Sequence, residues 1–133
     1  MTDALQGFTH VSLSVNNVEG SLAFYRDVLG LPVLLDVYDG SVFEGREAMV
    51  RVGRMALCLQ EHAKNDGTSF QPNRTGLDHL AFYVPSEEDL HGWADQLTAR
   101  DVDHSGVKPL PGFGHFIELR DPDGIQLELH SPA

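Results

Sequence analysis

The chain has 133 residues, enough for one domain that buries roughly two thirds of its surface on folding and needs no covalent cross-link. It carries 20 Asp and Glu against 9 Lys and Arg, which gives a net charge of −11 and a pI of about 4.8. Such a surface repels nucleic-acid phosphates and anionic lipids, so we expect neither nucleic acid nor a membrane as a partner. The same charge would attract a cationic ligand.

The compartment follows from cysteine usage and from the N-terminal residues. The single cysteine, Cys58, excludes an intrachain disulfide. The first residues form neither a basic nor an apolar segment of the kind that directs secretion, and no run approaches the ~18 apolar residues of a membrane span. We therefore expect a protein of the reducing cytoplasm.

The first half of the chain is predicted to form a strand, a helix and three further strands. Residues 9–15 alternate between polar and apolar side chains, which is typical of a half-buried strand. Residues 18–29 carry apolar side chains at helical spacing, and Gly30 followed by Pro32 ends this helix. The further strands are predicted at 34–37, 48–52 and 55–60.

The second half repeats this order after a polar segment, 61–76, that we interpret as a linker. A strand is predicted at 78–84, and Ser86 caps a helix whose apolar stripe is Leu90, Trp93, Ala94 and Leu97. Strands follow at 103–108, 116–120 and 125–130. The sequence therefore predicts a single α+β domain of two tandem βαβββ modules, at about 7–60 and 77–131, that form a curved mixed sheet.

Two histidines occupy equivalent positions in this repeat. The strands around His10 and His79 both read polar-His-apolar-x-apolar-x-Val, and strand alternation places both imidazoles on the polar face. Glu128 lies on the polar face of the last predicted strand, and His130 follows on the same face as a candidate partner of that carboxylate. Two imidazoles and one carboxylate are a set that holds a divalent metal and leaves positions open for chemistry.

The paired modules, with FYRDVLG at 24–30 and DPDGIQLE at 121–128, resemble the vicinal oxygen chelate superfamily over essentially the whole chain. That superfamily includes glyoxalase I, extradiol dioxygenases, fosfomycin-resistance thiol transferases, methylmalonyl-CoA epimerase and bleomycin-binding proteins. The resemblance implies a cavity inside the curved sheet in which His10, His79 and Glu128 bind a divalent metal.

The resemblance also bears on the number of metal ligands. Glyoxalase I-like members carry a second metal-binding Glu at the strand position of Cys58, so a three-ligand set remains here. Cys58 and Gln60 are predicted to line the cavity and contact substrate, with Gln60 as a weak fourth ligand in the alternative. Such a set favours Fe(II), with Mn(II), Zn(II) and Ni(II) as alternatives.

Four further residues are candidates for contact with a small-molecule substrate. Ser12 and Tyr83 share strand faces with the two histidines, and Ser12 and Glu118 are the candidate catalytic residues. Extradiol-like members usually carry a Tyr at the position of Glu118, which is here either a general base or a solvated residue at the rim. Phe113, between two glycines, is either a lid over an aromatic ligand or part of a plain turn.

The remaining histidines receive simpler interpretations. His91 falls on the polar side of the second predicted helix and is expected to face solvent. His115 lies next to the Gly112–Gly114 loop, near the rim of the predicted cavity.

Three functions are compatible with these residues. The leading hypothesis is a non-heme Fe(II) dioxygenase acting on an aromatic or polyketide-like substrate with adjacent oxygens. The second is a lyase, isomerase or fosfomycin-type thiol transferase that uses the metal as a Lewis acid. The third is a metal-free protein that sequesters a cationic antibiotic, which the acidic charge favours.

The open edges of two four-stranded half-sheets predict a homodimer with two equivalent sites. Whether each site belongs to one chain or is shared across the dimer stays open.

Overall fold

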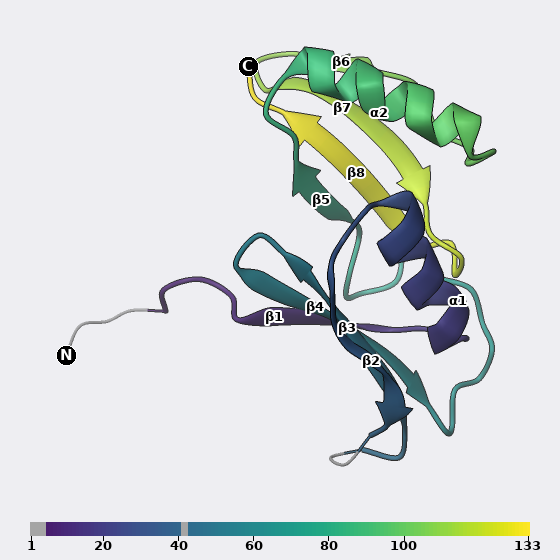
Figure 1. The fold of residues 1–133 in the computed structure, drawn as a ribbon. Helices are drawn as coiled ribbons and strands as arrows, with labels where there is room; N and C mark the ends of the chain where they lie inside the picture. Colours follow the sequence, from purple (N-terminus) through teal and green to yellow (C-terminus); the bar gives the residue numbers. More distant parts are fainter. Residues whose placement is uncertain (1–4, 41–42) are drawn as a thin grey trace. The chain divides into compact units, whose positions relative to one another are not determined.

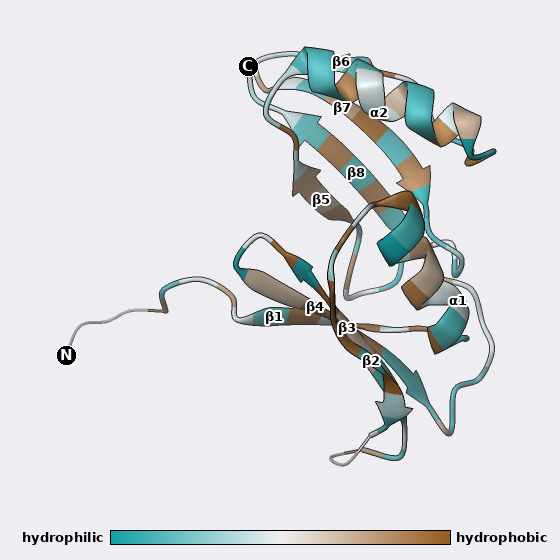
Figure 2. Ribbon diagram, viewed as in Figure 1, coloured by the Kyte–Doolittle hydropathy of each residue, from teal (hydrophilic) through white to brown (hydrophobic). Residues whose placement is uncertain are grey.

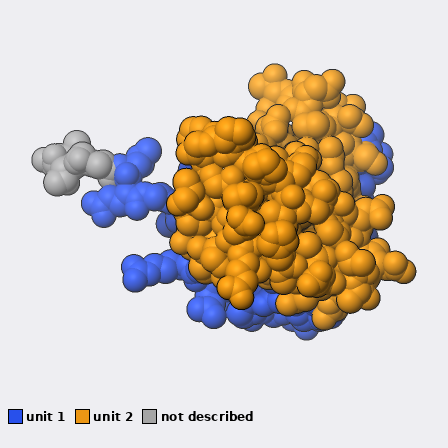
Figure 3. Space-filling model, turned by 90° about the horizontal axis from the view of Figure 1, so that it is seen from above, with its two compact units in different colours: residues 1–68 blue, residues 69–133 orange. Residues whose placement is uncertain are grey.

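The computed structural model describes residues 5–40 and 43–133, and the chain divides into two compact units at residues 68 and 69 (Figure 3). Each unit contains one four-stranded mixed sheet with a helix against it. The element order is βαβββ in both units. The predicted α+β class with two tandem βαβββ modules is therefore confirmed.

The first unit contains β1 (His10–Ser14), α1 (Val18–Ala23), the π-helical turn η1 (Phe24–Val28), β2 (Val33–Asp39), β3 (Gly45–Val52) and β4 (Met55–His62) (Figure 1). Its strands lie in the order β1-β4-β3-β2. The β1–β4 pair is parallel and the other two pairs are antiparallel.

The second unit contains β5 (Leu80–Tyr83), α2 (Glu87–Ala99), β6 (Lys108–Leu110), β7 (Gly114–Arg120) and β8 (Gln126–Ser131). Its order, β5-β8-β7-β6, repeats that of the first unit, again with one parallel pair, β5–β8. Among the described residues, no helix is long and apolar enough to cross a membrane.

Side-chain caps fix where both helices begin. The Asn17 side chain accepts a hydrogen bond from the backbone N–H of Gly20 at 3.2 Å, and Ser86 Oγ accepts one from Asp89 N–H at 3.1 Å. The predicted cap at Ser86 is thus confirmed. The first helix differs from the uniform helix predicted over 18–29, because its second half widens to a π turn in which Leu29 N–H donates to the Phe24 carbonyl.

Strand alternation separates the two faces of each sheet. In the first unit the helix covers the buried Leu13, Val15, Ala48, Val50, Leu57 and Leu59, and in the second unit it covers Ile117, Leu119, Leu127 and Leu129. Figure 2 shows the corresponding alternation of hydrophobic and hydrophilic residues along β7 and β8. The opposite face of each sheet, which the helix of the same unit does not cover, is called the open face below.

Two sequence predictions about the second unit are wrong. No strand forms over 103–107, because Gly106 has a φ of +72° and the Ser105 hydroxyl takes the backbone N–H of Glu118 at 2.9 Å. Pairing there is limited to an isolated bridge at His104. Trp93 and Ala94 are only half-buried, because α2 buries Leu90 and Leu97 fully and leaves Trp93 on its flank, beside the end of β5.

Candidate metal and substrate site

The open face of the second unit gathers the polar side chains of β7 and β8. Cross-strand pairing sets Glu118 opposite Glu128 and Phe116 opposite His130. The Phe116 ring stacks on the His130 imidazole with centroids 5.2 Å apart. This face is where the sequence placed Glu118, Glu128 and His130.

Glu128 is a buried carboxylate on that face, with only 9% of its side chain exposed. Its Oε1 lies 2.7 Å from His130 Nε2 and 3.5 Å from His79 Nε2. Its Oε2 accepts a hydrogen bond from Gln126 Nε2 at 2.8 Å. Both oxygens are therefore oriented by neighbouring side chains.

The electrostatic surroundings favour the ionised form of Glu128. Burial raises the pKa of this carboxyl group, but the hydrogen bonds from His130 and Gln126, together with the two nearby imidazoles, lower it further than burial raises it. The net result is a pKa below the ordinary value for Glu. At neutral pH the group is a carboxylate, the form that a metal requires.

The His79 ring is anchored at its other nitrogen. Nδ1 lies 2.8 Å from Asp78 Oδ1, and a carboxylate can only accept, so Nδ1 carries the proton. In the neutral imidazole the lone pair is then on Nε2, which faces Glu128 Oε1. Two electron-pair donors at 3.5 Å suit a bridging cation, since metal bonds of about 2.0–2.2 Å hold neighbouring ligands roughly 3 Å apart.

His10 has the equivalent local arrangement in the first unit. Thr9 Oγ1 lies 2.9 Å from His10 Nδ1, so in both units the residue before the histidine engages Nδ1. The Thr9 hydroxyl can donate or accept here, so this contact orients the ring without fixing which nitrogen carries the proton. His10 is exposed on the open face of β1, as the alternation predicted.

Ser12, Cys58 and Gln60 lie on the same open face as His10. Ser12 is paired with Cys58, and Ser14 with Gln60, across the parallel β1–β4 pair. Burial raises the pKa of the Cys58 thiol, a hydrogen bond with Ser12 opposes this, and the charge of Glu47 adds to the increase. The Cys58 thiol is therefore neutral at physiological pH when no metal is bound.

Glu47 is a buried carboxylate on this face that sequence analysis missed. It lies on β3 opposite Gln60, and its Oε2 accepts a hydrogen bond from the Tyr38 hydroxyl at 2.7 Å. This bond, with burial and the negative charge, raises the pKa of Tyr38. The signal was present in the sequence, because the alternation through Ala48 and Val50 turns Glu47 away from the helix.

The other candidate residues differ in their surroundings. Glu118 Oε2 forms an ion pair with Lys108 Nζ at 2.9 Å, and Lys108 also lies over the Phe116 ring. Tyr83 is exposed but stands next to His130 across the β5–β8 pair. Phe113 is exposed in the turn before β7 and contributes to no described cluster.

The structure thus brings together His79, Glu128 and His130 in one unit, and His10, Ser12 and Cys58 on one face of the other. Within either unit, no three described His, Cys, Asp or Glu side chains already surround a single metal position. That His10 completes the set around His79 and Glu128 stays a prediction.

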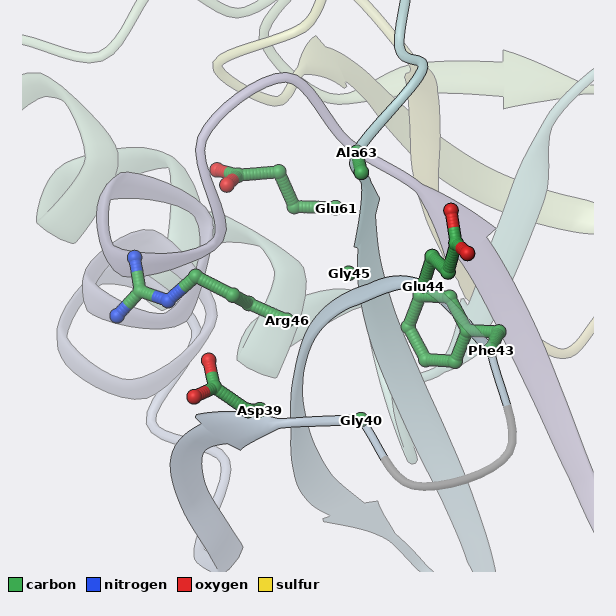
Figure 4. A pocket seen from close by; sticks show the side chains of 8 residues that line it. All are labelled: Asp39, Gly40, Phe43, Glu44, Gly45, Arg46, Glu61 and Ala63. Carbon is green, nitrogen blue, oxygen red and sulfur yellow. The ribbon is translucent and has the colours of Figure 1, made fainter.

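A pocket of about 720 Å³ in the first unit lies away from these residues (Figure 4). Two of its charged side chains have structural partners: Arg46 forms an ion pair with Glu19, and Glu61 Oε1 accepts a hydrogen bond from Val18 N–H at 3.0 Å. The pocket is lined by Asp39, Gly40, Phe43, Glu44, Gly45, Arg46, Glu61 and Ala63, none of which is a predicted site residue.

Comparison with known proteins finds relatives that cover almost the whole chain. The metallothiol transferase FosB of Staphylococcus haemolyticus is 28% identical over 134 residues, covering 96% of this chain and 84% of the relative. The manganese-dependent 2,3-dihydroxybiphenyl 1,2-dioxygenase of Geobacillus genomosp. 3 is 28% identical over 133 residues, covering 98% of this chain but 38% of that enzyme.

A solved structure and a family model extend the comparison. The glyoxylase/bleomycin resistance protein/dioxygenase domain of Frankia sp. EAN1pec superposes with a TM-score of 0.86 at 30% identity, covering 98% of this chain and all of that domain. The model of the Glyoxalase/Bleomycin resistance protein/Dioxygenase superfamily matches residues 7–129. The chain therefore belongs to this superfamily, as the sequence resemblance indicated.

Proposed function

We propose that this protein is a metal-dependent enzyme, most specifically an Fe(II) dioxygenase, that acts on an aromatic or polyketide-like substrate with two adjacent oxygen atoms. The observation that carries the proposal is the pairing of His79 Nε2 with the buried, ionised Glu128 at 3.5 Å. His10 is proposed as the third ligand. A divalent metal bound by these residues would coordinate the vicinal oxygens of the substrate and, as iron, would also activate dioxygen.

The residues around the proposed ligands support this assignment. Asp78 fixes the His79 ring through Nδ1, and His130 and Gln126 fix the two oxygens of Glu128. Metal-binding side chains are commonly held in this way, because a fixed ligand loses less conformational freedom on binding.

The neutral Cys58 supports a site with three protein ligands. Its raised pKa disfavours the thiolate, so it is proposed to line the site beside Ser12 rather than to bind the metal. An octahedral ion would then keep positions for both substrate oxygens and for dioxygen. Gln60, also on this face, is proposed to contact substrate.

The aromatic and ionic groups near Glu128 are proposed to handle the substrate. The stacked Phe116 and His130 rings, with Tyr83 beside them, offer flat surfaces to an aromatic ring. Glu118 stands opposite Glu128 and is held by Lys108, so it is proposed to accept the substrate's hydroxyl proton and pass it to solvent. Phe113 is proposed to close over the bound ligand.

A second candidate function, thiol transfer or isomerisation with a Lewis-acid metal, has one observation in its favour. The similarity to the FosB transferase extends over 84% of that enzyme, whereas the similarity to the dihydroxybiphenyl dioxygenase extends over only 38% of it. Dependence on dioxygen separates the two functions.

We also propose a homodimer. In each four-stranded sheet the first strand of the unit is an end strand, which leaves one edge able to pair with a second copy. Exposed Val33, Leu34 and Leu35 on the end strand β2 add apolar surface.

The ligand assignment predicts that His79→Ala loses tightly bound metal. Protein purified without added metal and dialysed should hold metal at this site by elemental analysis, and the variant should contain about one metal fewer per chain because one of three protein ligands is missing. His62→Ala, which removes an exposed histidine outside the proposed site, should keep the wild-type content. Undiminished metal in His79→Ala would refute the assignment.

The role of Cys58 predicts a selective effect of Cys58→Glu. A carboxylate at this position would occupy one of the open coordination positions, so binding of nitric oxide, a dioxygen surrogate, to the anaerobic Fe(II) protein should fall more than iron binding itself. Cys58→Gln, similar in size but uncharged, should affect nitric oxide binding far less. Equal substrate turnover under nitrogen with Mn(II) would replace the dioxygenase proposal with the Lewis-acid alternative.

The dimer proposal predicts a sedimenting species of twice 14.6 kDa at micromolar concentration. A monomer of 14.6 kDa would contradict it.

Refolding a mixture of His10→Ala and Glu128→Ala chains tests whether the site is shared between chains. Metal binding is recovered in the mixture only if each site takes residues from both chains.

A further inference from the structure

A second cluster of metal-binding side chain types lies on the helix-covered face of the second unit. Glu87, the first residue of α2, has His91 one helical turn later, with His91 Nε2 3.3 Å from Glu87 Oε2. His115, on β7, places its Nε2 3.3 Å from Glu87 Oε1. His115 has the strand parity of the buried Ile117, which faces α2, so this cluster and Glu128 lie on opposite faces of the sheet.

We propose that Glu87, His91 and His115 form a second binding site for a divalent transition metal, of which Zn²⁺ is the best match. Two imidazoles and one carboxylate are ligands that Zn²⁺ accepts, with water completing the coordination. A separation of 3.3 Å between a ring nitrogen and a carboxylate oxygen is close to the distance between neighbouring ligands of one metal, since each bond is about 2.0–2.2 Å long.

As they stand, Glu87, His91 and His115 do not yet form a metal-binding group among the described residues, so a bound metal requires side-chain rotation. In the structure the two imidazoles contact different oxygens of Glu87, so they do not yet surround a single point. The side chains of Glu87 and His91 are 50% and 61% exposed, which leaves both free to rotate toward His115. Residues four apart on a helix face the same side, so the Glu87–His91 pair needs no change in the backbone.

The local charge is suitable for a cation. The N-terminus of a helix carries a partial positive charge that opposes a bound metal. Here Glu87, Glu88 and Asp89 all lie in the first turn of α2 and outweigh it. The two histidines are neutral when they bind a metal, so they add no positive charge against it.

A metal at this position would link the start of α2 to the start of β7. His115 directly follows the turn that carries Phe113, so the bound ion would also restrain that turn. The site is independent of the proposed catalytic residues, because it shares no side chain with them.

The test is a calorimetric titration of the chelator-treated His79→Ala chain with ZnCl₂, so that the proposed catalytic site does not contribute. We expect one equivalent of Zn²⁺ to bind. Adding His91→Gln or His115→Gln to this chain should weaken zinc binding at least ~10–100-fold. That is the cost of losing a group that only supports a metal ligand, and losing a ligand itself costs no less. Adding His104→Gln, a histidine of the same unit outside the cluster, should leave affinity unchanged.

No zinc binding by the His79→Ala chain, or binding that both glutamine variants leave unchanged, would overturn the proposal. A parallel titration of the wild-type chain removes any dependence on the folding of His79→Ala, because the number of zinc equivalents should drop by one in His91→Gln and in His115→Gln. If the proposed catalytic site binds no metal, the wild type should still bind zinc at Glu87, His91 and His115.

Discussion

The proposed metal site depends on one buried charge, the carboxylate of Glu128. A side chain with 9% exposure that stays ionised needs compensation, because transfer of an isolated carboxylate out of water is very costly. His130 and Gln126 supply hydrogen bonds, one to each oxygen, and His79 faces Oε1 at 3.5 Å. These contacts favour the charge, and they also aim it at the position where a metal would be shared with His79.

The sheet makes this arrangement possible through its register. Strand alternation puts Leu127 and Leu129 under α2 and turns Gln126, Glu128 and His130 to the open face. A shift of one residue along β8 would bury the three polar side chains under the helix and expose the leucines. The apolar core therefore fixes the register, and the register in turn places the polar cluster.

Much of this was predictable from the sequence because it rests on short periods. The two modules, the cap at Ser86 and the shared face of Ser12 and Cys58 follow from alternation and local signals. The π turn after α1 was not predictable, since moving hydrogen bonds by one residue hardly changes an apolar pattern. The irregular segment before β6 was not predicted, because the Ser105 side chain takes the Glu118 N–H that a regular strand would bond through its backbone.

The candidate site was likewise predictable from the sequence only in part. The parity of Glu128 was predicted, but the contacts that ionise and orient it depend on side chains packed around it, and Asp78 was not singled out. Glu47 was missed because the strand was predicted to begin at residue 48, and because its hydrogen-bond partner, Tyr38, lies on a different strand. Whether His10 joins His79 depends on how modules associate, which no local pattern encodes.

The most direct test of the central claim counts the imidazoles bound to the metal. Pulsed electron paramagnetic resonance on protein loaded with less than one equivalent of Mn(II) detects couplings to ligand nitrogens. In protein that carries His91→Gln and His115→Gln throughout, so that the second proposed site is removed, we predict two imidazole nitrogens when His10 and His79 are intact and one after either His10→Ala or His79→Ala, where metal binds only weakly. A signal without nitrogen coupling, or one that neither substitution changes, would contradict it.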